Sequence, residues 1–139
     1  MRKTTYFLST IFLMLVATTG FAGYFQDVPV IIDFNSGFSE GNQLTAKTAP
    51  NDVEYIGCGV RNFNDGAFSF RFGFCQAGDA AGNEVFCDTQ NPSLVDDIGS
   101  MSDYAYITFS WREVAPDVYE CIRVGSSTQS FYLPEKKAK

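Results

Sequence analysis

Four cysteines are the residues of this chain whose type and spacing could do chemistry most directly. They stand at positions 58, 75, 87 and 121, and the chain contains no histidine. Zinc sites use closely paired cysteines or add histidine, whereas thioredoxin-type redox centres and c-type haem attachment need a C-x-x-C pair. None of these spacings occurs. We therefore expect no metal, no cofactor and no redox centre at the cysteines.

An even number of cysteines in an exported chain indicates two disulfides. Of the three connectivities we favour Cys75–Cys87, because a turn at 78–83 would bring these residues opposite each other on a hairpin. Cys58 must then join Cys121. This choice contains a conflict, since the alternation of side chains along the strands predicts that Cys58 points inward and Cys121 outward. A β-bulge at Gly57–Gly59 would resolve the conflict.

The start of the chain has the pattern of a secretory signal peptide. Arg2 and Lys3 precede an apolar run over 6–17, and Gly20-Phe21-Ala22 offers small residues at a cleavage site. The run is shorter than the ~20 residues that cross a bilayer, so we expect cleavage and no membrane span. The sequence thus predicts a signal peptide at 1–22 and a single secreted or periplasmic domain at 23–139, of bacterial type. Residues 134–139 should form a flexible tail.

The predicted mature domain is acidic. Without Arg2 and Lys3 it carries 8 basic and 16 acidic residues, a net charge of −8. Such a surface repels phosphate backbones, so nucleic acid is a poor partner. The simplest interpretation of dispersed acids is solubility, and a cationic partner is the alternative.

Alternating apolar residues predict a hairpin that joins 53–61 to 67–75 around Asn64-Asp65-Gly66. Pairing residue 63 with residue 67 puts Phe70, Phe72 and Phe74 opposite Val60, Cys58 and Ile56. We therefore expect these phenylalanines to form core.

A second hairpin should join 104–113 to 118–124, with Phe109 and Trp111 inward and Phe109 opposite Ile122. One short α-helix is expected at about 91–102, capped by Asn91 and begun by Pro92. Weaker strand patterns cover 29–34, 43–48 and 128–133. The predicted fold is mainly β: a small antiparallel β-sandwich or partly open barrel with this one helix, stabilised by disulfides.

Catalytic motifs are missing from the sequence. Without histidine there is no Ser-His or Cys-His pair, and no phosphate-binding or dinucleotide-binding glycine motif occurs. Glu113 and Glu120 could in principle form the carboxyl pair of a glycoside hydrolase. Asp96, Asp97 and Asp103 lack the spacing of a calcium loop. We therefore expect a protein that is not an enzyme.

Arginine and tyrosine gather on the outward face of the predicted strands. This candidate interaction face comprises Arg71, Tyr104, Tyr106, Arg112, Tyr119 and Arg123, with Arg112 opposite Tyr119. Protein interfaces are rich in both residue types, although packing of arginine stems over tyrosine rings across strands is the simpler explanation of the pattern.

We expect a non-enzymatic protein-binding module, similar to an inhibitor or an immunity factor, that presents this face or the loop between Cys75 and Cys87. The alternative is a small-ligand or carbohydrate-binding domain that uses the tyrosines with or without Trp111, although an inward Trp111 argues against it. A hydrolase with paired carboxylates is a distant third.

Overall fold

The computed structural model describes residues 24–134. The predicted signal peptide at 1–22 and nearly all of the predicted tail lie outside these residues. No helix among the described residues is long and apolar enough to span a bilayer. The elements follow in this order: β1 (Ile31–Asp33), β2 (Phe38–Asn42), α2 (Gln43–Thr48), β3 (Tyr55–Asn64), β4 (Ser69–Gly78), β5 (Glu84–Thr89), α3 (Pro92–Gly99), β6 (Tyr106–Ala115), β7 (Val118–Ser127) and a 3-10 turn (Ser130–Tyr132).

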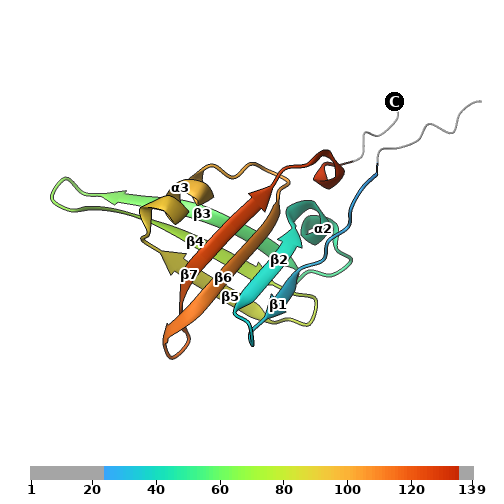
Figure 1. The fold of residues 1–139 in the computed structure, drawn as a ribbon, viewed down its shortest axis with the longest axis horizontal. Helices are drawn as coiled ribbons and strands as arrows, with labels where there is room; N and C mark the ends of the chain where they lie inside the picture. The colour runs from blue at the N-terminus through green and yellow to red at the C-terminus, as the bar shows by residue number, and fades with distance from the viewer. Residues whose placement is uncertain (1–23, 135–139) are drawn as a thin grey trace, which may run out of the picture.

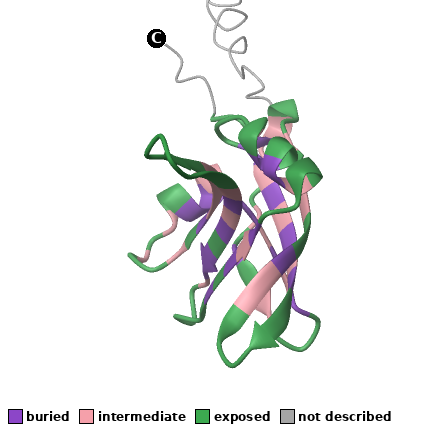
Figure 2. Cartoon of the chain, turned by 90° about the vertical axis from the view of Figure 1, so that its left-hand side faces the viewer, coloured by how far each residue is buried: buried purple, intermediate pink, exposed green. Residues whose placement is uncertain are grey.

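The seven strands form one mixed sheet in the order β1-β2-β6-β7-β5-β4-β3 (Figure 1). Neighbouring strands are antiparallel except β5 and β7, which meet in parallel at Asp88 and Glu120. The sheet curves around the core without closing, and buried positions alternate with more exposed ones along the strands (Figure 2). The prediction of a mainly β, partly open fold is confirmed, whereas a sandwich of two sheets is not formed.

Helix α3 agrees with its predicted place. The Asn91 side chain accepts hydrogen bonds from the N–H groups of Ser93 and Leu94, and Pro92 occupies the first turn. Val95 and Ile98 are buried on its inner side. Their spacing of three residues puts both side chains on one face of the helix, which covers β4.

Two of the weaker strand predictions are wrong. Residues 43–48 form helix α2, because the buried Asn42 accepts hydrogen bonds from the N–H groups of Leu44 and Thr45 and so begins a helix. Residues 128–133 contain the 3-10 turn and no strand, since β7 already ends at Ser127. The prediction at 29–34 is confirmed as the shorter β1.

The β3–β4 hairpin exists, but its predicted register is wrong by three residues. Asn64 pairs with Ser69, so the connection is a four-residue turn instead of a three-residue loop. The Asp65 side chain accepts hydrogen bonds from the N–H groups of Ala67 and Phe68, and the Asp65 N–H donates to the carbonyl of Phe68. Because three is odd, the shift moves the phenylalanines of β4 to the other face of the sheet.

The β6–β7 hairpin also exists, with a β-bulge that the sequence pattern did not reveal. Phe109 is opposite Val124 and Trp111 is opposite Cys121, so Ile122 is the extra residue on β7 and its side chain is exposed. Phe109 and Trp111 are buried, as predicted. A second irregularity makes Val114 the extra residue on β6, which puts Tyr119 and Cys121 on the inner face together with Trp111. The predicted conflict between Cys58 and Cys121 therefore does not arise, and β3 pairs without a bulge through Gly57–Gly59.

The two expected disulfides are present, with a different connectivity from the one favoured. Cys58 joins Cys75 and Cys87 joins Cys121. Cys75 is directly opposite Cys58 on one side and Cys87 on the other. Cys75 and Cys87 therefore lie opposite each other as predicted, but the observed register of β3 also puts Cys58 opposite Cys75, and these two form the bridge.

Candidate functional site

The six residues of the predicted arginine–tyrosine face do not share one face. Tyr119 lies opposite Glu113 on the inner side of the sheet, with its ring edge-on to Trp111 at 6.2 Å between centroids. Arg71 donates to Asp96 of α3 at 2.6 Å. Tyr104 lies in the connection before β6 and has a positive φ of 61°. Three of the six residues are therefore separated from the rest.

The other three residues lie on the outer face of β6 and β7, and each contacts a side chain of this chain. Tyr106 donates to the carboxylate of Glu40. Arg112 pairs with Glu120 at 2.6 Å and is not opposite Tyr119 as predicted. The Arg123 Cζ is 5.5 Å from the centroid of the Phe38 ring. Packing across strands, the simpler interpretation, accounts for all three residues.

A different set of side chains forms a continuous, exposed apolar surface on the sheet. We call it the phenylalanine face; it comprises Phe63, Phe68, Phe70, Phe72, Phe74 and Phe86, from β3, the β3–β4 turn, β4 and β5. Four of these rings are exposed, up to 60% for Phe68, and Phe72 and Phe74 are half-buried. The prediction that the phenylalanines of β4 form core is therefore wrong. Monomeric proteins rarely expose so many large apolar side chains together, except where a partner or ligand binds.

The rings of the phenylalanine face form a continuous series. Phe63, Phe68 and Phe70 contact one another at the end of the hairpin, with centroids 5.5–6.3 Å apart. Phe70 stacks on Phe72, Phe72 contacts Phe74, and Phe74 stacks on Phe86 across the strands at 5.7 Å. Since each ring is supported by its neighbours, the surface is preformed. The hairpin that carries it projects beyond the other strands (Figure 1).

The opposite face of β4 explains why these rings point outward. Its inward positions Gly73, Cys75 and Ala77 are all buried and small. Helix α3 lies so close to Gly73 that a Cβ there would stand 2.6 Å from the Ile98 Cδ1. The inner side of β4 therefore has no room for phenylalanine, and the disulfide to Cys58 fixes the same orientation.

One positive charge lies on the phenylalanine face. The Arg61 Cζ is 4.9 Å from the centroid of the Phe74 ring, and its guanidinium donates to the carbonyl of Val60. Gly59, opposite Phe74, leaves the space into which that ring extends. At the end of the hairpin, hydrogen bonds from the N–H groups of Phe68 and Ala67 lower the pKa of Asp65 below its ordinary value.

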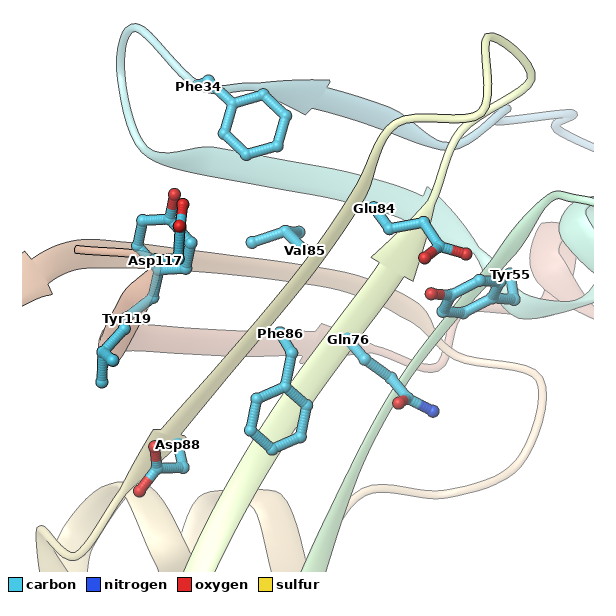
Figure 3. A pocket seen from close by; sticks show the side chains of 10 residues that line it. Phe34, Tyr55, Gln76, Glu84, Val85, Phe86, Asp88, Asp117 and Tyr119 are labelled. Carbon is cyan, nitrogen blue, oxygen red and sulfur yellow. The ribbon is translucent and has the colours of Figure 1, made fainter.

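A shallow groove of about 650 Å³ adjoins the phenylalanine face at Phe86 (Figure 3). It lies among the β1–β2 turn, the start of β5 and the β6–β7 turn. This opening exists because β5 is paired with β7 only at Asp88. The lining residues are Phe34, Tyr55, Gln76, Glu84, Val85, Phe86, Asp88, Asp117, Val118 and Tyr119.

The groove combines aromatic rings with carboxylates. Phe34 is held edge-on to Trp111 at 5.9 Å, and half of its surface remains exposed. Glu84, Asp88 and Asp117 supply three carboxylates, and no lysine or arginine lines the groove. Partial burial, together with the charge of Glu84, raises the pKa of Tyr55. The groove is therefore a site of negative charge between apolar walls.

The carboxyl pair considered for hydrolysis is not formed. Glu113 is opposite Tyr119 and Glu120 is opposite Arg112, so the two glutamates point to opposite faces of the sheet. Glu120 is bound in the ion pair with Arg112. Within residues 24–134 no group of three or more cysteine, aspartate or glutamate side chains is placed to hold a metal ion.

Comparisons with protein families, with curated proteins and with solved structures found no match to this chain. The fold and the site thus define the class: a small, disulfide-bonded β domain with a preformed aromatic surface.

Sequence reasoning missed the phenylalanine face, although a signal for it was present. In β4 the residues that alternate with the phenylalanines are Gly73, Cys75 and Ala77. A strand with small residues at every second position suits close packing of a helix on that side, which leaves the large residues for the other side. The groove had no signal of this kind, because it joins segments far apart in the sequence.

Proposed function

We propose that this protein is an exported, non-catalytic protein-binding module whose contact surface is the phenylalanine face. The observation that carries the proposal is the continuous series of six rings, four of them exposed. Interface cores are enriched in aromatic residues and arginine, and Arg61 lies beside this series. Two disulfides and a leader-like start of the chain support export.

The chemistry of phenylalanine favours a protein partner over a carbohydrate. Phenylalanine has no polar atom. Burying a fully exposed phenylalanine side chain is worth roughly 1.5–3 kcal/mol, so covering one of these half-exposed rings is worth about half of that. Sugar hydroxyls would need several hydrogen-bonding partners, and only three polar side chains lie opposite these rings: Arg61, Gln76 and Asp88. A partner with its own apolar side chains matches the face better.

The groove favours a second candidate function, the binding of a small ligand. Its volume of about 650 Å³ lies in the range of ligand sites, although it is open to solvent. A ligand in the groove would contact Phe34 and Tyr119, and it would not contact the phenylalanines of the β3–β4 hairpin.

Capture experiments with matched variants test the proposal. Tagged wild-type protein, the Phe63→Ser/Phe70→Ser double variant and an Ile31→Ser/Ile122→Ser control would each be used to isolate partners from the native compartment. All four positions are exposed, so both variants should fold. We expect a partner that the wild type and the control retain and that the double variant loses. Equal capture by all three proteins would overturn the proposal and favour the small-ligand candidate.

A further inference from the structure

The carboxylates of the groove have no cationic partner among the described residues. The ion pairs found among residues 24–134 are Arg71–Asp96 and Arg112–Glu120. Neither pair includes Glu84, Asp88 or Asp117, the three carboxylates of the groove. Carboxylates beside exposed aromatic rings favour a cation through two interactions. The negative charge of the carboxylates attracts it, and the face of the ring adds a cation–π contact. The groove therefore has the charge and the walls that a basic side chain would match.

The groove and the phenylalanine face are parts of one surface. Phe86 contributes to both, because its ring stacks on Phe74 and also lines the groove. A second hollow continues past the groove and shares Asp88, Val118 and Tyr119 with it. It is also lined by Glu120, whose carboxylate is paired with Arg112. An extended chain segment that lies on the phenylalanine face can thus continue past Phe86 into the groove with its three carboxylates.

We propose that the groove binds the basic side chains, arginine or lysine, of an extended peptide segment. This inference rests on the proposed function, since it assigns the chemistry of the partner at the same surface. The chain itself shows the geometry that such a contact requires. Arg61 over Phe74 and Arg123 over Phe38 each place a guanidinium within 5.5 Å of an exposed or half-buried ring. Phe34 and Phe86 offer comparable ring surfaces, each about half exposed, next to carboxylates that those two arginines lack.

A defined peptide tests the inference without knowledge of the natural partner. The probe is acetyl-Ala-Arg-Ala-Arg-Ala-amide, compared with the same peptide containing lysine and with one containing citrulline, the neutral analogue of arginine. Binding to the full-length protein would be followed by NMR, through the backbone amides of 84–88 and 117–119. We expect shifts confined to these segments for the arginine or lysine peptide. We also expect about ten-fold weaker binding of the citrulline peptide, and weakening by added salt.

Charge-matched variants separate the groove from the overall acidity of the protein. Glu84→Gln/Asp88→Asn/Asp117→Asn removes three carboxylates from the groove, and Asp27→Asn/Asp52→Asn/Asp97→Asn removes three exposed carboxylates elsewhere. The first variant should bind the arginine peptide about ten-fold more weakly, while the second should bind it almost as the wild type does. Thermal unfolding of each variant would establish that it is folded. Equal binding of the citrulline peptide, or equal weakening in both variants, would overturn the inference.

The peptide-binding test of the groove and the partner-capture test of the phenylalanine face can fail independently of each other. Phe63→Ser/Phe70→Ser leaves the groove intact and should bind the arginine peptide as the wild type does. If that double variant captures partners normally while the peptide binds the groove, the proposed function fails and the groove inference stands. If capture is lost in the double variant but the peptide shows no charge dependence, only the groove inference fails.

Discussion

Phe74 extends across Gly59, its partner on the neighbouring strand, so closely that a Cβ at Gly59 would stand 2.9 Å from the Phe74 Cζ. The glycine thereby lets the ring lie flat over β3 and lets Arg61 reach it. An aromatic ring across a strand glycine also covers backbone that would otherwise face water. The centre of the phenylalanine face thus depends on a residue that has no side chain.

Gly59→Ala should alter binding more than stability. The added methyl group displaces the Phe74 ring and breaks its contacts with Phe86 and Arg61. Because the ring can move outward, the free energy of unfolding should change by less than about 1 kcal/mol. The control is Gly57→Ala on the same side of β3, where no atom lies closer than 4.0 Å to the added Cβ. Denaturant unfolding and partner capture would be measured for both; a Gly57→Ala variant that loses the partner equally would contradict the explanation.

Phe70→Ala and Phe109→Ala should differ strongly in stability. Phe109 is fully buried, so its truncation should cost about 3–5 kcal/mol. Phe70 is 37% exposed and contacts mainly other rings of the phenylalanine face, so its truncation should cost about 1 kcal/mol. Urea titration of the two variants checks this. If Phe70→Ala were as unstable as Phe109→Ala, the phenylalanines of β4 would belong to the core, and the exposed phenylalanine face would be contradicted.

The disulfides should map to Cys58–Cys75 and Cys87–Cys121. Peptide mapping of the unreduced protein would identify both links, and a peptide joining Cys75 to Cys87 would contradict the observed register. The bridges enclose sequence separations of 17 and 34 residues. On the chain-entropy estimate, replacing Cys87 and Cys121 by serine should cost about 4 kcal/mol and replacing Cys58 and Cys75 about 3 kcal/mol.

Tyr106 should make the protein lose stability in alkaline solution. Burial, followed by the hydrogen bond to Glu40, raises the pKa of Tyr106 from 10.0 to about 12. The unfolded chain therefore releases this proton at a lower pH than the folded protein does. The contribution of protonated Tyr106 to the free energy of unfolding is fully present below pH 10, and it is lost as the pH rises through about 12. Between these values the unfolding free energy of the wild type should fall more steeply than that of Tyr106→Phe, as urea titrations at several pH values would show; parallel profiles would contradict the assignment.

The parts of the fold that the sequence predicted correctly depend on local chemistry. Asn91 and Pro92 specify the start of a helix within a few residues, and the alternation of apolar residues specifies both long hairpins. Which face of a strand is buried depends on more distant relationships. The turn at Asp65 shifts the register of β3 by three residues, and the extra Val114 beside the β6–β7 turn shifts Tyr119 and Cys121 by one. Either shift is small in the chain but reverses the side to which the following residues point.

The candidate site was not predictable for the same reason. The alternation of phenylalanines in β4 shows that they share one side of the strand, but only the small residues between them, Gly73, Cys75 and Ala77, indicate that the other side is the buried one. The arginines and tyrosines are of the types that interfaces use, yet their partners in the structure, such as Asp96 and Glu40, come from segments distant in the sequence. Pairing across the sheet, and not composition, decides which of these side chains remain available.

The two disulfides enclose separate segments of the chain, and neither one crosses from one segment to the other. One encloses 58–75 and the other 87–121, so no bridge spans the turn between β4 and β5, whose residues 80–83 are exposed. A protease cut at the Asp65–Phe68 turn would leave both new ends linked through Cys58–Cys75. A cut within 80–83 would instead produce two fragments that no disulfide joins. Each fragment would keep its own bridge, and only non-covalent contacts would connect the two. The pairing of β4 with β5 and of β2 with β6, together with the packing of α3 on β3 and β4, would then hold the nicked molecule together. The two halves could be produced separately and combined.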